Sequence, residues 1–140
     1  MKSNPEYFKN KKEEDKILNN QYQKMKIEED KLYKQELKVA KYPIFVAIKF
    51  NKNSQFDDLM ISDRDLKMKN VQGYTLLRVA MQYKNEYALN RLLQSGANMY
   101  AMDKHNSYSD FTWAVSGNDL KTVKIFLENG VDVNFQYKKI

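Results

Sequence analysis

A short motif recurs three times in the second part of the chain, and this repetition limits the fold more than any other feature of the sequence. Each copy ends in an alanine, and the spacings are 33 residues from Ala47 to Ala80 and 34 residues from Ala80 to Ala114. Two further landmarks recur in the same register. An apolar pair begins twelve residues after each alanine, as Leu59-Met60, Leu92-Leu93 and Phe126-Leu127. A turn follows each pair, at Asp63-Arg64-Asp65, Gly96-Ala97-Asn98 and Gly130-Val131-Asp132.

Each copy has the pattern of two short helices joined by a tight turn. The alanine is small enough for a neighbouring helix to approach closely, and Leu89, Leu92 and Leu93 have the i, i+3, i+4 spacing of one helical face. A glycine then ends the second helix in a left-handed conformation. One such pair cannot bury both of its faces, so pairs stack into a solenoid. We therefore expect an all-α fold, which the few glycines and prolines also favour.

These residues resemble the ankyrin repeat, whose hallmark is T-P-L-H-x-A, then a leucine-rich helix and G-A-D-V-N. The segment Thr75-Leu76-Leu77-Arg78-Val79-Ala80 keeps the Thr, Leu and Ala but has Leu76 for Pro and Arg78 for His. Gly130-Val131-Asp132-Val133-Asn134 differs only in its second residue. The resemblance covers about residues 41–135 and implies an ankyrin-repeat domain over 41–140, with repeats at about 41–69, 70–103 and 104–140. The first repeat departs most, since Asp63 replaces the usual glycine.

Residues 1–40 form a different zone, rich in Lys, Glu, Asn and Gln and without glycine. Ser3-Asn4-Pro5-Glu6 is typical of a helix start. Asn19-Asn20 predicts a break, followed by a second helix from about Gln21 to Ala40. We therefore expect a charged helical N-terminal segment.

The apolar residues of this segment leave its role open. Met25, Leu32 and Val39 share a helical face, but Glu29 and Glu36 interrupt the neighbouring positions and argue against a coiled coil. The segment could be a solvated helix that covers the end of the repeat domain, a helix that binds a partner or itself, or a disordered stretch.

The net charge of +6 does not come from one basic block. Residues 1–41 and residues 42–140 each have a basic excess of three, with acids interspersed, which argues against nucleic acid as the main partner. The chain has no cysteine, no apolar leader at its start, and no apolar stretch longer than Ile44–Ile48. We therefore expect a cytoplasmic protein without a membrane span.

The inventory for catalysis is poor. His105 is the single histidine and falls in a loop, and cysteine is absent. Asp57 and Asp58 are adjacent on a helix, so their carboxylates diverge, and the four glycines are too scattered for a phosphate loop. We expect no enzymatic activity, no metal site and no cofactor.

The resemblance implies a partner surface built from the hairpin tips and the exposed face of the first helix of each repeat. Tyrosines are prominent there, and aromatic side chains often anchor interfaces, although these rings could instead pack against neighbouring hairpins. The candidate partner-binding residues are Gln72, Tyr74, His105, Asn106 and Tyr108 at the tips, and Lys49, Phe50, Gln82 and Tyr83 on the helices.

Two further expectations follow from the same register. Trp113 precedes the third alanine, as Val46 and Val79 precede the other two, which predicts a core residue; the alternative is an exposed binding aromatic. Arg91, Lys84 and Lys121 are expected on the outer side of the domain.

The sequence thus predicts a non-enzymatic protein–protein binding module, such as a stoichiometric inhibitor, with another protein as partner and a monomer or heterocomplex as its state. One version is an immunity protein that neutralises a bacterial toxin. One alternative is a host-directed bacterial effector or adaptor. Another class of function is binding of nucleic acid or an anionic surface through the N-terminal lysines.

Overall fold

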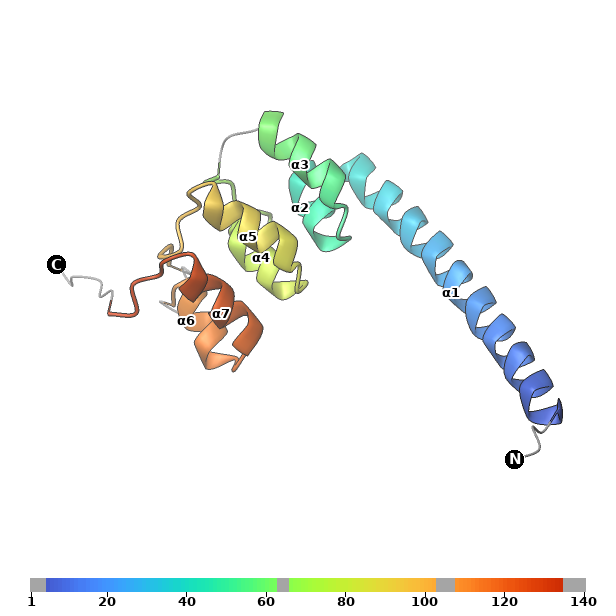
Figure 1. Cartoon of the computed structure of the whole chain (residues 1–140). Helices are drawn as coiled ribbons and strands as arrows, with labels where there is room; N and C mark the ends of the chain where they lie inside the picture. Colours follow the sequence, from blue (N-terminus) through green and yellow to red (C-terminus); the bar gives the residue numbers. More distant parts are fainter. Residues whose placement is uncertain (1–4, 63–65, 103–107, 135–140) are drawn as a thin grey trace. The chain divides into compact units, whose positions relative to one another are not determined.

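The computed structural model describes residues 5–62, 66–102 and 108–134, and over these residues it is helical, with seven α-helices and no strands (Figure 1). Two isolated bridges, between Lys69 and Thr75 and between Met102 and Ser109, close the hairpins that connect successive helical pairs. The all-α prediction is confirmed. The chain divides into two compact units, Met1–Ala40 and Lys41–Ile140, and each is described by itself.

The first unit is one long helix, α1 (Pro5–Val39). The predicted break at Asn19-Asn20 is wrong, because α1 runs through both residues. An interior Asn costs only about 0.7 kcal/mol of helix propensity relative to Ala, and neither Pro nor Gly lies nearby to interrupt the backbone. The proposed capping residues Ser3 and Asn4 lie outside the described residues.

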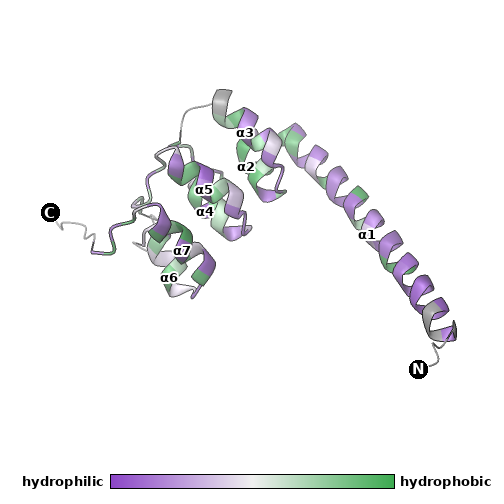
Figure 2. Ribbon diagram, in the orientation of Figure 1, coloured by the Kyte–Doolittle hydropathy of each residue, from purple (hydrophilic) through white to green (hydrophobic). Residues whose placement is uncertain are grey.

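The polarity of α1 differs from that of the helices in the second unit. Figure 2 shows α1 as mostly hydrophilic with scattered hydrophobic turns, whereas α2 is mostly hydrophobic. Met25, Leu32 and Val39, which share a face of α1, are all exposed. This face offers apolar side chains to solvent at intervals of seven residues.

The second unit consists of three helical pairs. The pairs are α2 (Pro43–Lys49) with α3 (Asn53–Ser62), α4 (Leu76–Gln82) with α5 (Glu86–Gln94), and α6 (Asp110–Ser116) with α7 (Leu120–Glu128). The first helices pack in series, α2 on α4 and α4 on α6, and the second helices do the same, α3 on α5 and α5 on α7 (Figure 1). The unit is therefore a two-layered stack of helical pairs.

The turns inside the pairs repeat the sequence period in their backbone angles. Asn51, Lys84 and Asn118 occupy the same position of each turn and have φ values of 54°, 53° and 55°. Gly96 and Gly130 follow α5 and α7 with φ values of 90° and 82°, so the left-handed glycines are confirmed. The corresponding turn of the first pair, Asp63-Arg64-Asp65, lies outside the described residues.

Side-chain caps fix where the helices begin in the second and third pairs. Thr75 and Ser109 accept hydrogen bonds from the N–H groups of the third helical residues of α4 and α6. Asn85 and Asp119 do the same for α5 and α7. Tyr42 precedes α2 and offers no such bond, so the first pair is the least regular of the three.

The core lies where the pairs meet. Ala47, Ala80 and Ala114 are all buried, as the close approach of stacked helices requires. Leu92 and Phe126 are fully buried in the second helices. Leu127 is exposed instead of packed, because α7 belongs to the last described pair and no further pair covers it.

Candidate protein-binding surface

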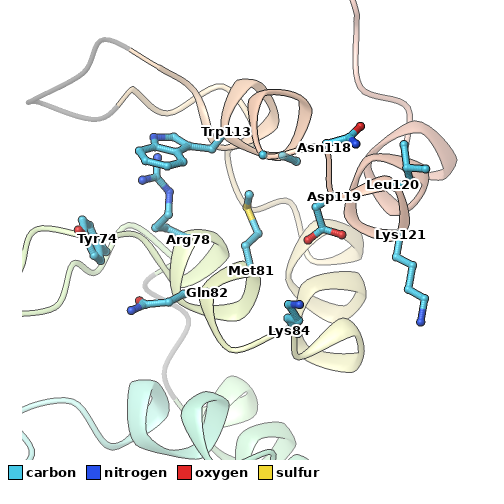
Figure 3. Close-up of a pocket in the computed structure, with 12 residues that line it drawn as sticks. Tyr74, Arg78, Met81, Gln82, Lys84, Trp113, Asn118, Asp119, Leu120 and Lys121 are labelled. Atoms are coloured by element: carbon cyan, nitrogen blue, oxygen red, sulfur yellow. The ribbon is translucent and has the colours of Figure 1, made fainter.

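An open pocket of about 680 Å³ lies between the first helices α4 and α6 and the turns that follow them (Figure 3). We call it the α4–α6 pocket. Both layers of the stack contribute to it, since its wall continues from the turn after α6 into the first residues of α7. The lining residues are Tyr74, Arg78, Met81, Gln82, Lys84, Trp113, Ala114, Gly117, Asn118, Asp119, Leu120 and Lys121.

A buried ion pair joins the two helices at one side of this pocket. The Nε atom of Arg78 in α4 lies 3.1 Å from Oδ1 of Asp110, the first residue of α6. The hydroxyl of Thr75 donates to Oδ2 of the same carboxylate at 2.8 Å. Asp110 is only 2% exposed, and contacts of this kind stabilise a buried charge. The ion pair fixes α6 relative to α4.

The same arginine stacks against aromatic rings. The guanidinium carbon of Arg78 lies 4.5 Å from the centre of the Trp113 ring and 5.6 Å from that of Tyr74. Figure 3 shows the guanidinium group beside the indole, with Met81 projecting next to them. A planar guanidinium can donate hydrogen bonds to a carboxylate along its edge and stack against an aromatic ring with its face. Arg78 therefore holds the Trp113 ring in place at the mouth of the pocket.

The interpretation of Trp113 as a core residue is wrong. Trp113 is 38% exposed, whereas Val46 and Val79, which occupy the same register position, are buried. Those two valines lie in α2 and α4, each of which is covered by the helix of the next pair, while α6 is the first helix of the last described pair. The indole is also too large for the space that a valine fills. The alternative, an exposed aromatic, is what the structure shows.

Lys84 and Lys121 flank the pocket on the side opposite Tyr74 (Figure 3). Both are exposed, and within the described part of the chain neither ammonium group has a carboxylate partner. The nearby carboxylate of Asp119 is engaged in capping α7, with bonds of 3.3 Å from the Thr122 N–H and 2.7 Å from its hydroxyl. The expectation that these lysines face the outer side is therefore wrong: they line the pocket.

A glycine leaves the pocket open at one position. Phe50, Tyr83 and Gly117 are the residues that end α2, α4 and α6, in the same register. Gly117 has φ −78°, a value that any residue adopts, so its backbone does not require glycine. A Cβ atom there would lie 3.3 Å from the carbonyl oxygen of Trp113. The missing side chain thus keeps the pocket free rather than easing a turn.

The structure separates the candidate partner-binding residues into groups. Tyr74 and Gln82 line the α4–α6 pocket. Lys49, Phe50 and Tyr83 form a second cluster, in which the Lys49 ammonium lies 5.4 Å from the Phe50 ring centre and 5.7 Å from that of Tyr83.

The remaining candidates lie at the hairpins. Gln72 and Tyr108 are exposed but do not line the pocket. His105 and Asn106 lie outside the described residues. The assignment of all nine residues to a partner surface stays a prediction.

Sequence reasoning missed several pocket residues. Arg78, Met81 and Leu120 were not among the candidates, and Trp113 was expected in the core. The sequence carried one signal, because Arg78 stands where the ankyrin pattern has His. A different side chain at this motif position indicates that it makes a different contact. The ion pair to Asp110 is that contact.

Another polar contact lies between the second helices. Asp57 of α3 accepts a hydrogen bond from the Tyr87 hydroxyl and pairs with Nε of Arg91 at 3.2 Å, both on α5. The hydrogen bond to Asp57, followed by partial desolvation, raises the pKa of the Tyr87 hydroxyl above its usual value. This contact links neighbouring pairs through their second helices.

The described residues contain no cluster of three or more His, Asp or Glu side chains that could hold a metal ion. None of their helices is long and apolar enough to cross a membrane.

Comparison with known proteins gives one distant relative. No family model matches the sequence. A stretch of 72 residues is 36% identical to the B-cell lymphoma 3 protein homolog of Mus musculus, an ankyrin-repeat protein. The match covers 51% of this chain and 16% of that protein, so the chain spans a small part of its relative's length. The match supports the presence of ankyrin repeats and suggests a protein-binding module.

Proposed function

We propose that residues 41–140 are an ankyrin-repeat solenoid that acts as a non-enzymatic protein-binding module, with the surface of α4 and α6 as its contact face. The α4–α6 pocket carries this proposal, because its aromatic and basic side chains are held in place before any partner arrives. Preorganised aromatic and arginine side chains in a concave, partly apolar site are typical of interface anchors.

The repeat architecture supports the proposal independently. The period of 33 or 34 residues appears in the helices, in the left-handed turn residues and in the caps, and the distant relative is an ankyrin-repeat protein. Stacked repeats offer one extended surface built from equivalent positions of successive units. Side chains at those positions can change without altering the stack, which suits recognition of a protein partner.

In its finer form the proposal is a stoichiometric inhibitor that works in the cytoplasm and occupies the surface of its target, as an immunity protein does with a bacterial toxin. A pocket with preorganised anchoring side chains suits a one-to-one complex. The alternative within the same class is a host-directed effector or adaptor, which would bring its partner to a third protein.

The proposal is tested by affinity capture with the full chain, its Trp113→Ala variant and its Leu127→Ala variant. Trp113 lines the pocket, while Leu127 is an exposed apolar residue of α7 outside it and serves as the matched control. We expect quantitative mass spectrometry of the captured material to find a protein that the wild type and Leu127→Ala bind equally and Trp113→Ala binds at least about tenfold less.

Circular dichroism must show that all three proteins keep the same helical content. Light scattering of the purified complex should give one copy of each chain. Capture of the same proteins by all three variants would overturn the proposed contact face. Nanomolar binding of nucleic acid at physiological salt would overturn the class of function.

A further inference from the structure

We propose that the α4–α6 pocket takes a bulky apolar side chain from a partner segment whose neighbouring residues are acidic. This inference rests on the proposed protein-binding function and specifies the chemistry of the segment that the pocket recognises. It follows from the apolar lining of the pocket, the charges that remain at its edge, and the way in which its walls are fixed.

The walls of the pocket favour an apolar occupant. Met81, Trp113 and Leu120 supply large apolar surfaces, and Ala114 and Gly117 keep the space between them free. The volume of about 680 Å³ falls within the range of roughly 300–1,000 Å³ found for ligand pockets. Leu120 is strongly exposed in this structure, so an occupant would remove its side chain from water as well as that of Trp113.

The charge around the pocket is positive once internal contacts are taken into account. Asp110 is neutralised by Arg78, and Asp119 is engaged as the cap of α7. Lys84 and Lys121 line the pocket on the side opposite Tyr74 (Figure 3) and are paired with no carboxylate of the described residues. Acidic residues on either side of the inserted side chain would meet these two ammonium groups. A basic segment would be repelled by the same pair.

The arrangement is fixed before binding. The guanidinium of Arg78 is held by a buried carboxylate on one edge and by the Trp113 ring on its face. Little conformational entropy is therefore lost in these walls when a partner side chain enters. The lysines, in contrast, are long and exposed, and they can adjust to the exact position of the partner's carboxylates.

The test uses three fluorescein-labelled nine-residue peptides and fluorescence polarisation with the full chain. The first peptide has a central Phe with two acidic residues on each side. The second has Lys at those four positions, and the third has Ser in place of the Phe. We expect the first to bind at least about tenfold more tightly than either of the others, because only it combines the apolar anchor with the matching charge.

The charge assignment is checked with Lys84→Glu plus Lys121→Glu, which should reverse the order of the acidic and basic peptides. The matched control, Lys11→Glu plus Lys12→Glu, makes the same change of net charge at exposed lysines of α1, outside the pocket, and should keep the order. Equal binding of the three peptides, binding of none of them, or an unchanged order in the Lys84/Lys121 variant would overturn the inference.

The two proposals can fail separately. Suppose that a protein partner is lost with Trp113→Ala but binds the Lys84/Lys121 variant unchanged. The proposed binding function would then be retained, and the inference that the partner segment is acidic would be wrong. If no captured protein requires Trp113 for binding, the proposed contact face itself would be wrong.

Discussion

The junction between α2 and α4 and the junction between α4 and α6 share one backbone arrangement but differ in their side chains. At the first, Tyr83 ends α4 and its ring lies beside the Lys49 ammonium. At the second, Gly117 stands in the equivalent place, and the Trp113 ring stacks on Arg78. The backbone turns that follow are the same, with φ near 54° at Lys84 and Asn118.

The polar contacts of the two junctions also differ. The amide of Asn85 donates to the carbonyl oxygen of Ile48 at 3.1 Å, which links the first two pairs through a neutral group. The second and third pairs are linked through the charged pair of Arg78 and Asp110. Because the repeating frame is common to both, the repeat pattern itself does not dictate which side chains make the link at each junction. The differences indicate where the surface has been specialised, which is why we place the contact face at α4 and α6.

The largest expected effect comes from removing what both junctions share. Ala80→Arg places a long charged side chain where α4 meets its neighbours, and the buried site has no room for it. We expect the free energy of unfolding to fall by more than about 4 kcal/mol, so that the repeat domain loses its cooperative thermal transition. Circular dichroism during heating measures this. Ala114→Arg should act in the same way in the third pair.

The control for Ala80→Arg is Val71→Arg, in the hairpin before α4. Val71 is 98% exposed, so the same charge and size should cost little there. A folded, cooperatively melting Ala80→Arg protein would show that the register of the three repeats is wrong.

The next effect separates the junctions. Asp110→Ala removes the carboxylate that pairs with the Arg78 guanidinium, which is largely buried. It also removes the acceptor of the Thr75 hydroxyl. We expect a loss of about 3 kcal/mol in the free energy of unfolding, measured by urea titration. Asp110→Asn keeps an acceptor for Thr75 and should cost less. Equal losses for the two variants would contradict this order and would mean that the charge of Asp110 accounts for the whole effect, with no contribution from the Thr75 hydrogen bond.

The neutral link of the first junction should cost less to break. Asn85→Ala removes the bond to the Ile48 carbonyl and the cap on the Ala88 N–H, both inside the core. We expect a loss of about 2 kcal/mol in the same urea titration. Gln94→Ala, at the exposed end of α5, is the control and should stay within about 0.5 kcal/mol. A larger loss for Asn85→Ala than for Asp110→Ala would reverse the comparison.

The sequence predicted the parts of this fold that depend on spacing. The alanine of the motif, such as Ala80, and the turn glycine, such as Gly96, recur at a fixed period. This recurrence predicts helices, close contacts and left-handed turns. Two of the candidates taken from the sequence, Tyr74 and Gln82, line the α4–α6 pocket, and their role in binding stays a prediction. The continuity of α1 was missed, because weak local propensities at Asn19 and Asn20 do not decide a helix whose neighbours all favour it.

The pocket could not be predicted in the same way. Its shape depends on which side chain covers which neighbour: Trp113 has the register of a buried valine but lies in the last described pair and is exposed. The partner of Arg78, Asp110, is 32 residues away in the sequence, and no spacing rule links a departure in one repeat to a carboxylate in the next. The sequence shows that Arg78 departs from the repeat pattern, but the contact that this side chain makes is seen only in three dimensions.

The smallest effect on stability is expected from making the two junctions alike. Gly117→Tyr gives α6 the residue that ends α4, at a backbone conformation that tyrosine adopts without strain. The contact of 3.3 Å between its Cβ and the Trp113 carbonyl costs a little, and the reduced freedom of the unfolded chain offsets it. We therefore expect the free energy of unfolding to stay within about 1 kcal/mol of the wild type.

The tyrosine ring introduced by Gly117→Tyr would nevertheless enter the α4–α6 pocket, so affinity for the partner captured by the wild type should fall by more than about tenfold. Gly117→Ala is the control, since a methyl group repeats the close contact without filling the pocket. Urea titration and isothermal calorimetry separate the two quantities: unchanged affinity in a folded Gly117→Tyr protein would show that the difference between the junctions has no part in binding.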